Sequence, residues 1–173
     1  MATVNKFKCQ PAYVEGGGFP VTAVYPEAAS QTFKRGEAVY LDGSGNVAEF
    51  TGAVDSGTQR FLGFAAEDGH DDSVAATSNV SVVIPTPGTV FEANVTANGS
   101  DQATAKTQVG VRYPMYQDTT NSIIMVDISD TGSQIDCLIV KEIVGTVGDT
   151  NGRVRFTVDS VALQVGGTQM TVS

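Results

Sequence analysis

The residues best suited to chemistry lie in one acidic stretch, EDGHDD, at positions 67–72. It contains His70, the one histidine of the chain, so a Ser-His-Asp or Cys-His catalytic device would have to use it. The carboxylates beside it favour the imidazolium form, which cannot accept a proton as a general base. The sequence therefore predicts a solvated loop histidine and no catalytic residue.

The same stretch is the first candidate for a metal site. Glu67, Asp68, Asp71 and Asp72 supply enough oxygens for Ca²⁺, but they lack the alternating acidic spacing and the closing Glu of an EF-hand loop. The turn DTNG at 149–152 has part of that pattern and lacks the later acid. We therefore predict no metal and no cofactor, and leave open whether loop 67–72 binds a cation.

The two cysteines, Cys9 and Cys137, are too few and too far apart in sequence for a disulfide framework or a zinc site. Glycoside hydrolysis needs only two carboxylates paired in space, so it stays an alternative, with Asp71 and Asp72 as the candidate acids. The chain has no Trp and five Tyr, which leaves few rings on which sugars could stack. The residue types thus favour a protein that is not an enzyme.

The composition decides the fold class. The chain of 173 residues has 24 Val and 19 Thr against 4 Leu. Val and Thr lose side-chain freedom in a helix and suit a pleated sheet, whereas Leu is a good helix former. This imbalance predicts an all-β protein, and the length suits one large domain or one domain with an ordered arm.

The charge argues against two classes of partner. The formal net charge is −9, and such a surface repels phosphate backbones and anionic lipids, so we predict no nucleic acid and no membrane as partner. Residues 61–105 contain no Lys or Arg, whereas Lys6 and Lys8 make the N-terminus basic. These opposite charges could steer identical subunits together, or only keep the chain soluble. The start of the sequence lacks the apolar segment of a signal peptide, so we expect synthesis in the cytoplasm with no export route of its own.

Apolar runs bounded by turn signals predict about eight to ten short strands in a single compact β-barrel or sandwich domain, residues 32–173. Val80, Val82 and Ile84 should share one face of a strand, followed by a turn at 85–89. Pro114 makes its run an edge strand, a bulged strand or one split at Tyr113. The predicted elements are a hairpin at 32–50 and strands at 61–66, 80–85, 90–95, 108–117, 122–128, 135–144 (a short helix being the alternative), 154–158 and 161–165.

The first 31 residues have no clean periodicity, but they are too aromatic for a disordered tail. Three prolines and the run Gly16-Gly17-Gly18 separate the large apolar side chains. We predict an extended N-terminal arm over 1–31 that becomes ordered by lying on another surface; the alternative is a first strand or two of the same domain. The candidate contact residues of this arm are Lys6, Phe7, Lys8, Tyr13, Phe19 and Tyr25.

Three motifs carry a resemblance to a known family. They are RGEAVYLDG at 35–43, FLGFAAED at 61–68 and PGTVFEA at 87–93. In this order they resemble the strand motifs of the small capsid decoration (cement) proteins of tailed bacteriophages. The resemblance covers residues 33 to 145 or so, and its motifs are structural rather than catalytic.

The resemblance implies a β-barrel subunit on the outer capsid surface of the virion, often a homotrimer at three-fold positions. The N-terminal arm would help to fasten it to the major capsid protein, and the function implied is to cement neighbouring capsid subunits. A tail-tube or fibre-associated β protein is the second hypothesis, and a glycan hydrolase the third.

Overall fold

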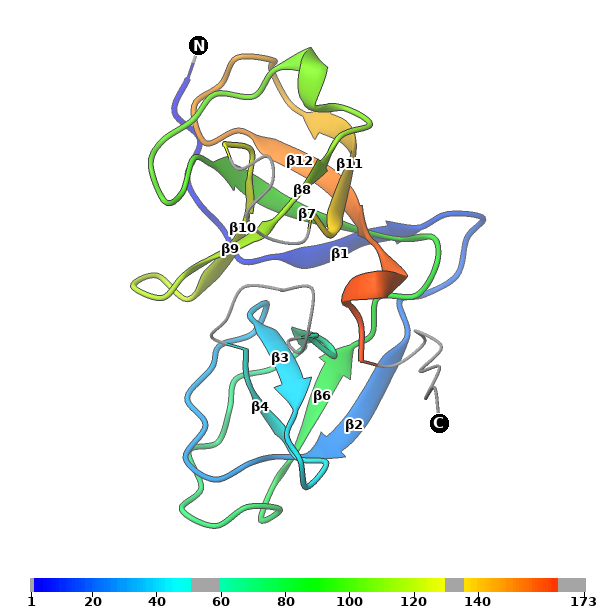
Figure 1. Cartoon of the computed structure of the whole chain (residues 1–173), viewed down its shortest axis with the longest axis vertical. Coiled ribbons are helices and arrows are strands. Elements are labelled where there is room, and N and C mark those ends of the chain that lie inside the picture. The colour runs from blue at the N-terminus through cyan, green and yellow to red at the C-terminus, as the bar shows by residue number, and fades with distance from the viewer. Residues whose placement is uncertain (1, 51–59, 130–135, 165–173) are drawn as a thin grey trace, which may run out of the picture.

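The computed structural model describes residues 2–50, 60–129 and 136–164, and within them the chain is almost entirely β-structure. In these ranges twelve strands form two sheets, which lie one above the other in Figure 1. Two single-turn 3₁₀-helices complete the described elements: η1 (Lys106–Gln108) and η2 (Ser160–Ala162). The all-β prediction is confirmed, and no helix in the described ranges is long and apolar enough to cross a membrane.

The first sheet has seven strands: six follow the order β8-β11-β12-β7-β10-β9, and β1 pairs with β7 outside that order. The strands are β1 (Gln10–Val14), β7 (Thr89–Thr96), β8 (Arg112–Tyr113), β9 (Met115–Asp118), β10 (Ile123–Asp127), β11 (Leu138–Val144) and β12 (Arg153–Val158). Only Pro114 separates β8 from β9, so one run of chain lies at both ends of the sheet and nearly closes it into a barrel. Of the outcomes predicted for Pro114, the structure shows the split at Tyr113, with β8 and β9 at the two ends of the strand order, because proline has no N–H for the ladder.

The second sheet has five antiparallel strands in the order β2-β6-β5-β3-β4. They are β2 (Thr22–Pro26), β3 (Ala38–Leu41), β4 (Val47–Glu49), β5 (Gly63–Ala65) and β6 (Asn79–Val83). A bridge between Glu27 and Val47, with the Ala28 amide donating to the Val47 carbonyl (2.8 Å), joins the two outer strands. The predicted hairpin at 32–50 is confirmed as β3 and β4.

The period of two predicted for β6 is also confirmed. Val80, Val82 and Ile84 belong to a core on one face of the second sheet, and Val83 faces the larger core between the sheets. The turn that follows is closed by the Thr89 amide, which donates to the Thr86 carbonyl (2.9 Å), and Gly88 supplies the positive φ of 86°.

Phenylalanine rings join the two sheets. Phe64 of β5 lies 4.8 Å from Phe91 of β7 and 6.5 Å from Phe156 of β12, between ring centroids. On its other side Phe64 lies 5.5 Å from Phe61. All four rings are buried, so the larger core is shared by both sheets.

The N-terminal segment predicted as an arm contributes a strand to each sheet. β1 pairs with β7 and β2 pairs with β6, both antiparallel, and Cys9 is buried in the shared core. These are the positions that the alternative interpretation, a first strand or two of the same domain, assigns to this segment. Whether these residues also bind a second protein stays a prediction.

Two predicted strand boundaries are wrong. Gln108, the first residue of the run predicted as 108–117, ends η1, and the first strand of that run begins only at Arg112. Residues 160–162 form η2 instead of beginning a strand at 161, because the Asp159 carboxylate accepts a hydrogen bond from the Val161 amide (3.1 Å) and caps a helical turn. Residue 165 and residue 135, the ends of two predicted strands, lie outside the described residues.

Candidate interaction surface

His70 has a partner that the sequence did not suggest. Its Nδ1 lies 2.6 Å from Oε2 of Glu27, a carboxylate that is 1% exposed and follows β2. The His70 amide donates to the other oxygen of the same carboxylate (2.8 Å). The hydrogen bond to Glu27 raises the pKa of His70, and the charges of Glu67 and Asp72 add to the effect. The raised pKa agrees in direction with the predicted imidazolium, but its largest cause is the hydrogen bond to Glu27, which lies 43 positions earlier in the sequence.

Two acids of loop 67–72, Glu67 and Asp68, have separate partners within the chain. Glu67 accepts a hydrogen bond from the Ser81 amide (2.6 Å). Asp68 accepts one from the Arg35 amide (2.8 Å), and this bond, with help from Lys34 and Lys8, lowers the pKa of the Asp68 carboxyl. Within the described ranges no group of three or more His, Cys, Asp or Glu side chains is arranged to hold a metal ion.

A second carboxylate, Glu37, is 2% exposed where the two sheets meet. Burial raises the pKa of Glu37, and the negative charge of Glu49 raises it further. The hydrogen bond that Glu37 accepts from the Lys34 amide lowers its pKa. Gln117 of the first sheet donates to both Glu37 (3.4 Å) and Glu49 (3.1 Å). Because Glu37 is shielded from solvent and held by the chain's own amides, the arrangement fits a polar tie between the sheets better than a carboxylate pair open to a sugar.

Two of the six predicted contact residues lie under arginines of β12. The guanidinium of Arg153 lies 5.5 Å from the centre of the Phe7 ring, and that of Arg155 lies 5.5 Å from the centre of the Tyr13 ring. Such cation–π contacts contribute about 0.5–1 kcal/mol at exposed sites. The rings are thus held against the chain's own barrel.

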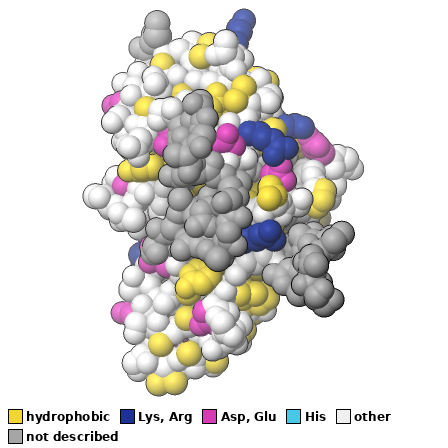
Figure 2. Space-filling view, in the orientation of Figure 1, with side chains coloured by type: hydrophobic (Ala, Val, Ile, Leu, Met, Phe, Trp, Pro, Cys, Tyr) yellow, Lys and Arg dark blue, Asp and Glu magenta, His cyan; other side chains and the backbone are white. Residues whose placement is uncertain are grey.

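One buried carboxylate orients both arginines. Glu92 of β7 accepts from Arg153 (2.7 Å) and from Arg155 (3.1 Å), and Arg155 also donates to Glu142 of β11 (2.9 Å). Figure 2 shows basic and acidic side chains next to one another over the first sheet, rather than in separate fields. This surface is therefore largely neutralised from within.

Three of the other four predicted contact residues also have partners in the chain. Lys6 lies 4.0 Å from Asp118, and Lys8 lies 3.9 Å from Asp68. Tyr25 is half-buried and packs against the core of the second sheet. Phe19 differs from all of these, since its side chain is 93% exposed.

Phe19 projects from a loop with a fixed base, residues 15–21, between β1 and β2 (Figure 1). The Glu15 amide donates to the Gly88 carbonyl (2.8 Å), and the Ile84 amide donates to the Val21 carbonyl (2.9 Å). Gly16, Gly17 and Gly18 have φ values of 82°, 89° and 107°, which other residues rarely adopt. The loop therefore presents Phe19 to solvent on a base hydrogen-bonded to the turn between β6 and β7.

Four exposed apolar side chains, which we call the apolar strip, lie on the stretch of chain from residue 13 to residue 24. It consists of Tyr13 (40% exposed), Phe19 (93%), Val21 (47%) and Val24 (65%). Single exposed apolar side chains are ordinary, but four on one short stretch of chain make that stretch a candidate contact for another molecule. The sequence identified Tyr13 and Phe19 and missed the two valines, because burial of a Val cannot be read from its type alone.

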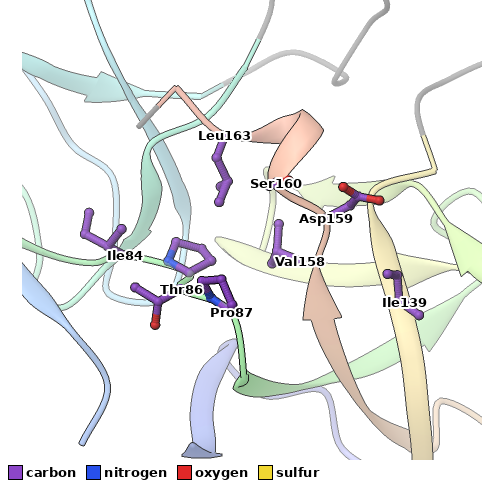
Figure 3. Close-up of a pocket in the computed structure, with 9 residues that line it drawn as sticks. Ile84, Thr86, Pro87, Ile139, Val158, Asp159, Ser160 and Leu163 are labelled. Carbon is purple, nitrogen blue, oxygen red and sulfur yellow. The ribbon is translucent and has the colours of Figure 1, made fainter. Parts of the chain in front are cut away.

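Beside the strip lies a pocket of about 410 Å³ between the two sheets. In Figure 3 Leu163 and Val158 lie across from Ile84 and Pro87. Pro85 and Ile139 complete the apolar lining, and the polar lining residues are Thr86, Asp159 and Ser160. Sequence analysis missed this pocket because its walls come from three separate stretches of chain.

Sequence comparison provides no independent identification. No model of a known protein family matches the chain, and no curated protein matches it. The resemblance to capsid decoration proteins therefore stays a prediction, and the function is argued from the surface.

Proposed function

We propose that this protein is a structural virion component that binds the outside of a phage head and cements neighbouring major capsid protein subunits. The observation that carries the proposal is the apolar strip of Tyr13, Phe19, Val21 and Val24 on a rigid β scaffold. We propose the major capsid protein as the partner because three motifs of the sequence resemble those of decoration proteins. A brace needs a stiff body and a surface for contact, and it needs no reactive centre.

The scaffold favours binding because little of the contact surface would have to become ordered when a partner binds. β1 and β2 are each paired along their length with β7 and β6, and the loop between them is hydrogen-bonded at its base. A surface that is already held in place loses little conformational entropy on association. Each contact on a shell can then be modest, since many copies that bridge more than one subunit add their effects.

The charge of the protein is compatible with an outer position. The formal net charge is −9, so a copy on the outside would not compete for the packaged DNA. The basic residues near the strip form ion pairs with acidic residues of the same chain, for example Lys141 with Glu15 (3.2 Å). The proposed contact with the shell therefore depends on apolar burial more than on charge.

Removal of residues 2–20 would be a poor test, because it would also remove β1 and the buried Cys9 from the barrel. A sharper test compares Val24→Ser with Val74→Ser. Both valines are 65% exposed, but Val74 lies outside the strip, in the segment between β5 and β6. Wild-type protein and both variants would be mixed with undecorated heads, and the bound copies and the temperature of head rupture measured.

We expect wild-type protein and Val74→Ser to bind the heads and raise the rupture temperature. Val24→Ser should bind up to about tenfold more weakly, because a buried Val side chain contributes about 1.5 kcal/mol. The proposal is rejected if wild-type protein does not bind heads, or if labelling of whole virions places it on the tail, as the tail-tube hypothesis requires.

A further inference from the structure

Two turns of the chain carry the same dipeptide, Asn-Gly, in opposite surroundings. Asn98-Gly99 lies at the tip of the reversal that follows β7, and Asn151-Gly152 lies in the turn before β12. Both asparagines have a left-handed backbone, with φ values of 49° and 52°, a conformation that Asn tolerates better than most residues. Asn98 is exposed, whereas Asn151 is only 4% exposed. One chemical step can therefore be compared in two environments of the same protein.

We propose that Asn98 is a site of spontaneous deamidation and that the fold protects Asn151 from the same reaction. The main-chain nitrogen of Gly99 attacks Cγ of Asn98, so that a new C–N bond forms and the bond from Cγ to Nδ2 breaks. The leaving amide takes up the proton of the attacking nitrogen and departs as ammonia, and a cyclic imide remains. Solvent water then opens the imide. The product is aspartate if the new bond breaks and isoaspartate if the original peptide bond breaks.

Both reacting groups are free at Asn98. Within the described residues, neither the Gly99 amide nor the Asn98 side chain forms a hydrogen bond. Glycine has no side chain that could hinder its nitrogen. The reversal is closed by Ala97 and Ser100, whose amides donate to each other's carbonyls (3.0 and 2.9 Å). A short exposed reversal opens at a small cost in free energy, so the backbone can rotate until the nitrogen reaches Cγ.

The same groups are held in place at Asn151. Its Nδ2, the leaving group, donates to Oδ1 of Asp101 (2.8 Å). The attacking nitrogen, that of Gly152, donates to the Asp149 carbonyl (3.1 Å). The carbonyl of Asn151 also accepts a hydrogen bond from the buried side chain of Asn94 (2.6 Å). Ring closure would break these bonds in a buried place, so the reaction has to wait until this turn opens.

Conversion of Asn98 would change one end of the first sheet. The Asn98 amide donates to Oδ1 of Asp127 (3.0 Å), a buried carboxylate at the end of β10. A carboxylate at position 98 adds a second negative charge close to this one. Isoaspartate also adds one carbon atom to the main chain of the reversal, so Ala97 and Ser100 could not both keep their hydrogen bonds. The parallel contact of β7 with β10, which ends at Asp127, should therefore loosen.

This inference involves neither the apolar strip nor any phage component, so it goes beyond the proposed function and stands or falls without it. The test incubates the full chain at neutral pH and about 37 °C, both native and unfolded in urea. Peptide mapping by mass spectrometry then follows the conversion of amide to acid at positions 98 and 151. Asn98→Gln is the control variant, because its longer side chain would have to close a larger and less favourable ring.

In the native protein we expect conversion at Asn98 to be at least about tenfold faster than at Asn151, because only the second reaction requires a buried turn to open. In urea the two sites should convert at similar rates, since the dipeptide is the same. The acidic species that accumulates on anion exchange should be absent from Asn98→Gln at this position. Since Asn98 is exposed, this replacement leaves the fold intact.

Three results would overturn the proposal. They are no conversion at Asn98 in the native protein, equal or faster conversion at Asn151 in the native protein, and a tenfold difference that persists in urea and is therefore not caused by the fold. The converted fraction, purified by its extra charge, should exchange amide hydrogens faster at the ends of β7 and β10. Unchanged protection there would refute the loosening of this contact.

Discussion

Replacement of Phe64 by Ala is expected to destabilise both sheets together. The side chain is 1% exposed, and its ring contacts Phe61, Phe91 and Phe156 across the junction of the sheets. Deletion of a buried Phe ring costs about 3–5 kcal/mol, through lost apolar burial and the cavity left behind. The whole free energy of unfolding of such a domain is about 5–15 kcal/mol, so the loss is a large share of it.

The assay is urea unfolding followed by far-ultraviolet circular dichroism, with calorimetry for the transition temperature. A loss of about 3–5 kcal/mol in a chain of this length should lower the melting temperature by about 6–20 °C. Phe64→Leu keeps most of the apolar volume and should cost less than about 1.5 kcal/mol.

Phe33→Ala is the matched control, because Phe33 is equally buried but belongs to the core of the second sheet alone. Amide hydrogen exchange in Phe64→Ala should rise in β7 and β12 as well as in β5, whereas Phe33→Ala should loosen the second sheet first. The reasoning is refuted if Phe64→Ala costs less than about 1.5 kcal/mol, or if only β5 and its neighbours lose protection.

Three further predictions concern titratable groups. The folded-state pKa of His70 is raised above its ordinary 6.5, so its bond to Glu27 should stabilise the fold fully below pH 6.5. This stabilisation should be lost as the pH rises through the higher folded-state pKa. In urea titrations at pH 5.5 and 8.5, the stability difference between wild-type protein and His70→Gln should therefore be larger at pH 5.5. Glu92→Gln should cost about 1–3 kcal/mol in the same assay, since it leaves two arginines without their shared carboxylate, and an unchanged midpoint would contradict that role. Burial raises the pKa of the Cys9 thiol, and it raises the pKa of the Cys137 thiol to about 12. Both thiols should therefore react with a thiol reagent at pH 8 only as fast as the chain opens. Rapid labelling of the native protein would show instead that these residues are accessible.

The local pattern of the sequence predicted most of the strands after residue 31, whereas β1 and β2 lie in the segment predicted as an arm. Val80, Val82 and Ile84 share a face because a pleat alternates, and the turn that follows needs Gly88 and the prolines. The pairing of strands was not predictable in the same way. β7, for example, pairs with β1, β12 and β10, which come from both ends of the chain. Which strands pair depends on how the strands pack in the folded protein, and the pattern within a single strand does not contain that information.

The candidate surface was predictable only in part. Aromatic side chains between residues 7 and 25 drew attention to a segment that does carry exposed apolar side chains, but residue type could not show which of them are covered by other parts of the chain. Phe7 and Tyr13 lie under arginines that come about 140 residues later, and Phe19 has no such cover. The partner of His70 was missed for the same reason, since Glu27 meets it only when the second sheet has formed.

The loop at 15–21 is anchored in two different sheets, and this has a mechanical consequence. A pull on its tip is divided between the ladder of β1 with β7 and the ladder of β2 with β6. Both are antiparallel, and each joins a strand of five residues to its neighbour. Tension on Phe19 would therefore load two rows of main-chain hydrogen bonds at once, and an insertion that slackened one side of the loop would transfer the whole force to a single row.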